Sequence, residues 1–263
     1  MASKILFAAF ATILSLPTLC YAKLPHYGTV SNISVGFVYA SLLERRGVVQ
    51  YRDYQILPSF SAFFFDDKLE FLAGDSIGYR DFIYENKIRL RSRIASINDQ
   101  PTFPNINSVR EGMPERKASY EWQNSLEFFF PAYDETYISE LDLTYHKDIS
   151  IHHGDYLDVL AKFKLGSFIF PGLKMLSEPN LMLSFGIGDS RHNQYFYGPS
   201  DTAKGINNVS AGVWFAFPEE ADRWYPVIQV YAFEAIGDHG KAEFSTGRNR
   251  GVMFSFIATT GIW

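Results

Sequence analysis

The chain has 263 residues, with 24 Lys and Arg against 29 Asp and Glu, and a formal net charge of −5. An acidic chain without a basic block lacks the positive surface that phosphate backbones require, which argues against nucleic acid as a partner. Aromatic residues make up 17% of the chain and apolar residues 47%. This composition excludes an intrinsically disordered protein, because disordered chains are poor in both.

The first 22 residues have the pattern of a secretory signal peptide. Lys4 supplies a positive charge, residues 5–19 are apolar, and Cys20-Tyr21-Ala22 resembles a cleavage site. The apolar stretch is shorter than the roughly 18 residues expected of a membrane-spanning helix. We therefore expect export, cleavage after Ala22, and a single mature domain of residues 23–263 without cysteine. Lipoprotein processing at Cys20 is the alternative, but Leu19 is bulky where a small residue is usual.

Apolar and polar residues alternate with a period of two along most of the remaining chain. In segment 138–146, for example, Leu141, Leu143 and Tyr145 alternate with Asp142 and Thr144. A step of 180° per residue is typical of a half-buried strand and not of a helix. Eleven strand-like runs are predicted: 31–42, 53–65, 68–79, 83–97, 119–130, 136–147, 156–170, 179–188, 205–217, 225–235 and 250–262.

The run lengths favour a transmembrane antiparallel β-barrel over an exported soluble sandwich, which is the alternative. Many of the runs are about as long as the 9–11 residues that cross a bilayer when tilted. Aromatic residues gather near run ends at 63–65, 128–130 and 224–225, as in the girdles at membrane interfaces.

The number of strands follows from the parity of such barrels. Bacterial barrels have even strand numbers, so we predict twelve strands, with ten as the alternative. One strand is then missing from the eleven runs, either between residues 66 and 97 or at the mature N-terminus. Counted back from the C-terminus, the longer connections 98–118, 148–155, 189–204 and 236–249 become outer loops. The shorter connections 131–135, 171–178 and 218–224 become periplasmic turns.

Segment 184–200 reads SFGIGDSRHNQYFYGPS, a strand ending in Gly-x-Gly followed by the loop NQYFYGPS. It resembles the MipA/OmpV family (MltA-interacting-protein-like barrels) of Gram-negative outer-membrane proteins, whose members carry an Asn-x-x-Tyr-Tyr-Tyr-Gly-Val-Ser-like loop. Phe196 and Pro199 depart from that pattern. Tyr195, Tyr197 and Gly198 are the matching family-motif positions, and we expect their role to be structural.

The resemblance implies an outer-membrane barrel of a Gram-negative bacterium, surrounded by outer-membrane lipid. One family member is described as an adaptor between a lytic murein transglycosylase and a murein synthase. The implied role is therefore a non-enzymatic scaffold or an envelope-integrity function, with periplasmic murein enzymes as partners. The resemblance supplies no catalytic residue, metal ligand or cofactor.

The polar rows of neighbouring strands predict a charged lumen. The rows run basic, acidic, acidic and mixed along the four strands from 83 to 170, and opposite charges on paired strands attract. We expect a salt-bridged lumen that keeps the barrel shut. An Arg-lined channel for acidic oligosaccharides is the alternative, because Arg forks match carboxylates. The predicted network comprises Lys87, Arg89, Arg91, Arg93, Glu121, Glu127, Glu140, Asp142, Asp158, Lys162 and Lys164.

A group of His and Asp residues surrounds one predicted outer loop: His146, Asp148, His152, His153 and Asp155. Such residues are able to hold a metal ion or to act as acid and base. A lipid A-modifying enzyme is therefore a second alternative. Vicinal His152 and His153 would point to opposite faces of a strand, however, so we expect no catalytic and no metal site here. Loop 98–118 is rich in Pro and Asn and is predicted to be irregular.

Overall fold

The computed structural model describes residues 30–51, 55–72, 75–97, 119–130, 138–166, 168–170, 175–216 and 225–261. Outside them lie the predicted signal peptide 1–22, the predicted connections 98–118, 131–135 and 218–224, and the first four residues of the predicted turn 171–178, whose residues 175–178 belong to a strand instead. Within the described residues, no helix is both long and apolar enough to span a membrane.

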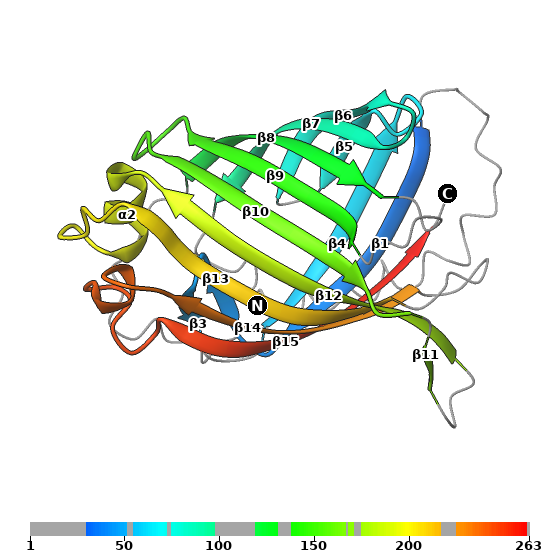
Figure 1. The fold of residues 1–263 in the computed structure, drawn as a ribbon. Coiled ribbons are helices and arrows are strands. Elements are labelled where there is room, and N and C mark those ends of the chain that lie inside the picture. Colours follow the sequence, from blue (N-terminus) through cyan, green and yellow to red (C-terminus); the bar gives the residue numbers. More distant parts are fainter. Residues whose placement is uncertain are drawn as a thin grey trace, which may run out of the picture.

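Twelve antiparallel strands form a closed barrel, which confirms the predicted fold class and strand number (Figure 1). Pairing of the first strand with the last, and of β10 with β12, closes the ring. In ring order the strands are β1 (Val30–Ala40), β4 (Gln55–Phe64), β5 (Leu69–Leu72), β6 (Ser76–Tyr84), β7 (Ile88–Ile97), β8 (Ser119–Phe129), β9 (Ile138–Asp148), β10 (Asp155–Lys164), β12 (Met175–Gly188), β13 (Gly205–Ala216), β14 (Tyr225–Ala235) and β15 (Arg250–Gly261).

The missing strand lies between residues 66 and 97, one of the two places predicted for it. Residues 69–97 form the three strands β5, β6 and β7 where two runs were expected. β5 has only four residues and is the shortest strand of the ring. The predicted run 156–170 also contains a break, because β11 (Phe168–Phe170) pairs with β12 in a hairpin that projects beyond the barrel (Figure 1).

The two ends of the barrel differ in their connections. At one end, called here the turn end, short turns join β4 to β5 and β6 to β7. At the other, called the loop end, lie the hairpin of β2 (Leu43–Arg45) and β3 (Val48–Tyr51), the helix α2 (Ser190–Tyr197) and the 3-10 turn η2 (His239–Lys241) (Figure 1). The predicted outer loops 148–155, 189–204 and 236–249 all fall at the loop end.

The barrel is polar inside and apolar outside, the reverse of a water-soluble protein. Along β8 the exposed side chains are apolar, with Trp122 48% exposed, while the alternating polar ones are buried, with Glu121 1% exposed. Many large apolar side chains are exposed on the other barrel strands, and aromatic Phe65, Tyr84 and Phe130 lie exposed at the turn end. A continuous apolar exterior of this extent marks a surface that meets lipid or a partner.

Candidate functional site

A cluster of buried apolar side chains crosses the mouth of the barrel at the loop end. Val48 from the β2–β3 hairpin and Phe196 and Tyr197 from α2 pack with Ile97 at the end of β7 and Ala235 at the end of β14. β7 and β14 are opposite each other in the ring. The cluster therefore bridges the lumen. We call the β2–β3 hairpin, loop 149–154, α2 and η2 together the loop-end plug.

The turn of the β2–β3 hairpin places an arginine at the centre of the plug. Arg46 and Gly47 both have positive φ, 53° and 81°, the geometry of a tight two-residue hairpin turn. Gly47 suits this geometry because it lacks a Cβ, and an added Cβ would meet Asn208 at 2.7 Å. The hairpin is held to the helix by Tyr197, whose hydroxyl donates to the Arg46 carbonyl at 2.9 Å.

Arg46 is enclosed by charged and aromatic groups from three parts of the chain. Its Nη2 donates to both carboxylate oxygens of Glu121 on β8, at 2.8 Å each, and Nη1 lies 3.0 Å from Nδ1 of His192 on α2. The guanidinium stacks over the rings of Tyr156 and Phe196, 4.1 and 4.5 Å from their centroids. A buried ion pair requires such complete enclosure by partners, since desolvation of both charges is costly.

Three histidines surround this ion pair. His146 Nδ1 lies 2.9 Å from Glu121 Oε2, and His152 Nδ1 accepts a hydrogen bond from the Gly154 amide at 3.0 Å. Burial and the charge of Arg46 hold the pKa of His192 well below its ordinary value of 6.5, and burial also lowers the pKa of His152. His192 is therefore neutral and accepts the hydrogen bond from Arg46.

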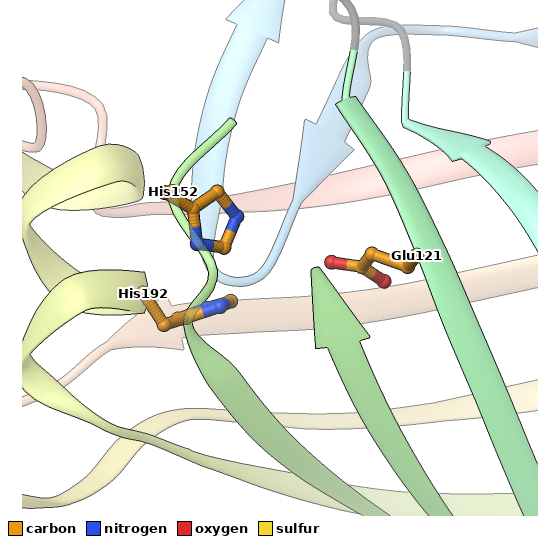
Figure 2. A group of neighbouring side chains, drawn as sticks. All are labelled: Glu121, His152 and His192. Atoms are coloured by element: carbon orange, nitrogen blue, oxygen red, sulfur yellow. The ribbon is translucent and has the colours of Figure 1, made fainter. Parts of the chain in front are cut away.

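Glu121, His152 and His192 present their ligand atoms within 4.8 Å of one another. Figure 2 shows the carboxylate reaching from β8 toward the imidazole on α2 and the imidazole on the loop after β9. Two imidazoles and a carboxylate are a donor set that Zn²⁺ accepts. The guanidinium of Arg46, however, already binds two of these groups. The group is thus built around an internal cation supplied by the hairpin.

The ring nitrogens of these histidines lie close to Arg46, Glu121 and the Gly154 amide. Among the described residues, no serine hydroxyl hydrogen bonds to His146, His152 or His192. His153 is exposed on the loop. Asp155, at the start of β10, pairs with Lys147 of β9 at 2.7 Å. Of the predicted His and Asp group, the structure therefore joins only His146, Asp148 and His152 to the plug.

The middle of the lumen contains a row of ion pairs on β5, β7 and β8. Arg91 binds Glu70 at 2.6 Å and lies 3.6 Å from Glu127, which also pairs with Arg89. Gly78 lies between Glu70 and Arg93 in the strand register, and a Cβ added to it would meet the Cβ of Arg93 at 2.4 Å. We call this row the charge ladder.

The remaining predicted lumen residues occupy several environments. Arg93 donates to Gln123 at 2.7 Å, and Lys162 binds Glu140 at 2.8 Å. Glu121 belongs to the plug instead of the ladder. Lys87 lies in the β6–β7 turn next to Glu85, and Lys164 is exposed at the end of β10, so both lie outside the network. Asp142 and Asp158 face the lumen from β9 and β10.

Two contributors to the site, Arg46 and His192, were not predicted from the sequence. The predicted runs 31–42 and 53–65 leave residues 43–52 as a connection, although Arg46-Gly47 followed by Val48-Val49 is a hairpin signal. The sequence pattern predicts an outer loop over residues 189–204, but Asp189 is a typical N-cap, and its carboxylate accepts from the His192 amide at 2.8 Å at the start of α2. The family-motif positions lie in the plug: Tyr195 stacks on His152 at 4.4 Å, and Gly198 ends α2 with φ of 130°.

No protein-family model matches the chain, and no curated protein sequence matches it either.

Proposed function

We propose that this protein is an outer-membrane β-barrel of a Gram-negative bacterium with a non-enzymatic scaffold or envelope-integrity role. The observation that carries the membrane location is the inverted distribution of side chains. Apolar side chains face outward along the strands, and carboxylates such as Glu70 and Glu127 are buried within the ring. Only closed barrels and helices satisfy every backbone group in lipid.

The state of the lumen supports a scaffold over a channel. The loop-end plug bridges opposite walls of the mouth, and the three arginines of β7 already bind carboxylates or Gln123. An arginine paired in this way is not available to an acidic oligosaccharide unless its partner is displaced. The lumen therefore serves to hold the barrel in one shape, and a rigid wall suits a protein that presents surfaces to others.

We further propose that the barrel is of the MipA/OmpV type. Its support is the NQYFYGPS segment, whose Tyr195 and Tyr197 both pack into the loop-end plug. In this proposal the partners are periplasmic murein synthases or transglycosylases, which would contact the turn end. The first residues of β1 and the last residues of β15 also lie at the turn end.

Orientation in the membrane is tested with two variants that each carry one introduced cysteine. The one natural cysteine of the sequence, Cys20, lies in the predicted signal peptide. Lys241→Cys lies at the loop end and Glu85→Cys at the turn end, and both native side chains are well exposed. A membrane-impermeant maleimide should label only Lys241→Cys on intact cells and both variants after permeabilisation. Equal labelling of both on intact cells, or a cytoplasmic protein without a heat-dependent gel shift, contradicts the proposal.

The scaffold role is tested with the purified barrel and in cells. In a planar bilayer we expect no persistent open-channel conductance, and a stable large conductance would refute a scaffold with a closed lumen. In cells, a photo-crosslinking residue at Asn86 in the turn end should capture murein enzymes, whereas the same residue at Lys241 should not. Capture from the loop end alone would contradict periplasmic docking.

A further inference from the structure

The lumen contains a cavity of about 330 Å³ directly beneath the loop-end plug. Arg46 and His146 form its upper boundary, and its walls come from the inner faces of β10, β12, β13, β14 and β15. This side of the lumen differs from the charge ladder, because its lining is largely neutral. The volume lies at the lower end of the roughly 300–1,000 Å³ that is usual for small-molecule sites.

One uncompensated charge faces this cavity. Arg46 contributes a guanidinium, but Glu121 binds it with both oxygens, so the pair is close to neutral. Asp158 is the remaining charged residue of the lining. In the described part of the chain no cation lies within ion-pair distance of its carboxylate, which interacts with the Val159 amide and with the more distant field of Arg46. A partly buried carboxylate of this kind favours a cationic partner.

The rest of the lining can hydrogen-bond to a ligand that also carries oxygen atoms. The hydroxyl oxygens of Ser184 and Ser210 are 2.7 Å apart, and both residues line the cavity. The Gln229 amide has the thioether sulfur of Met182 as its acceptor, at 4.0 Å. Sulfur is a weak acceptor, so a ligand hydroxyl oxygen would be a better partner for this amide. Met182 and Met253 add soft apolar contacts.

We propose that this cavity is a binding site for a small hydroxylated amine, of the chemical class of an amino sugar. The ammonium group would bind Asp158, and the hydroxyl groups would bind Ser184, Ser210 and Gln229. An ammonium has three donors and no acceptor, which matches a carboxylate surrounded by hydroxyl and amide groups. This site is independent of the proposed scaffold role, since it requires only the closed barrel and the plug.

The test is isothermal titration of the full-length barrel in detergent micelles with glucosamine, compared with glucose and glucuronate. Glucosamine should bind, and glucose, which lacks the ammonium, should bind at least about tenfold more weakly, a difference of about 1.4 kcal/mol. Asp158→Asn should weaken glucosamine binding by a similar factor. The matched control is Asp155→Asn on the same strand, because Asp155 pairs with Lys147 outside the cavity. The affinity of this variant for glucosamine should stay within about twofold of that of the unaltered barrel.

A second variant keeps the test decisive if Asp158→Asn fails to fold. Thr144 is the register partner of Asp158 on β9, so Thr144→Lys supplies an internal ammonium and should abolish glucosamine binding. The unboiled barrel's faster gel migration reports folding of each variant. The proposal is overturned if glucosamine does not bind, if it binds equally to the folded Asp158→Asn or Thr144→Lys proteins, or if glucuronate binds in preference to glucosamine.

Discussion

Two adjacent residues of β9 distinguish a lipid-facing exterior from any other explanation of the exposed apolar rows. Leu143 faces outward and has Leu126 and Val159 as its register partners on the flanking strands. Thr144 faces the lumen and has Ser125 and Asp158 in the same positions. Because consecutive strand residues point to opposite faces, Leu143→Lys and Thr144→Lys place the same charge on opposite sides of the wall.

The expected difference is large. An ammonium on the lipid side near the middle of a barrel strand costs about 2–4 kcal/mol, which is a roughly 30- to 1,000-fold shift of the folding equilibrium. On the lumen side, Thr144→Lys loses the 2.9 Å hydrogen bond to Ser125, worth about 1 kcal/mol. The attraction of the new ammonium to Asp158 offsets part of that loss, so the net change should stay within about 1 kcal/mol.

The free energy of unfolding is measured by urea titration of the refolded barrel in lipid vesicles, with tryptophan fluorescence and the unboiled gel shift as two readouts. Leu143→Lys should lower this free energy, and Thr144→Lys should leave it nearly unchanged. Equal destabilisation by both variants, or a greater effect of Thr144→Lys, would refute the assignment of the two faces to lipid and lumen.

Two further predictions concern the loop-end plug. The pKa values of His192 and His152 are lowered in the folded state, so the unfolded state takes up more protons as the pH falls below 6.5, and the plug loses stability in that range. Amide hydrogen exchange of residues 43–51, corrected for intrinsic rates, should show easier opening at about pH 5.5 than at about pH 7.5, and His192→Gln should reduce the difference. Removal of one partner of the buried ion pair, by Arg46→Met or Glu121→Gln, should cost about 3–5 kcal/mol of hairpin protection. The double variant should cost less than the sum, and additive losses would contradict direct coupling.

The fold could be predicted because the side-chain period alone places residues on the two faces of a strand. Runs such as 119–130 and 136–147 correspond closely to β8 and β9. The period could not locate the break between β5 and β6, because Ile77 and Tyr79 continue the alternation of Leu69 and Phe71 through it. Side-chain periodicity cannot detect a break between two strands whose alternation stays in phase. The extra strand was predicted only from the even strand number of bacterial barrels.

The candidate site was harder to predict because its members are distant in the sequence. Arg46 and Glu121 are 75 residues apart, and Arg46 and His192 are 146 apart. Each lies in a segment whose local pattern has another explanation, either a connection or a strand row. The pairing of Arg89 with Glu127 was predictable, since these two are register partners on adjacent strands. Arg46 reaches Glu121 and His192 across the lumen, without a strand register between them. Such contacts can be located only once the closed ring is known.

The asymmetry of the lumen connects the plug with the cavity beneath it. The wall from β5 to β8 holds charges that neutralise one another, whereas the cavity lining from β10 to β15 is neutral apart from Asp158. If the interior served only to stiffen the barrel, side chains would be expected to fill it completely, because unfilled volume loses packing energy. Instead, a cavity of about 330 Å³ remains along this wall. A plug that carries its own cation and counterion closes the loop end without using Asp158, and this carboxylate thereby stays available to a ligand that enters from the lumen.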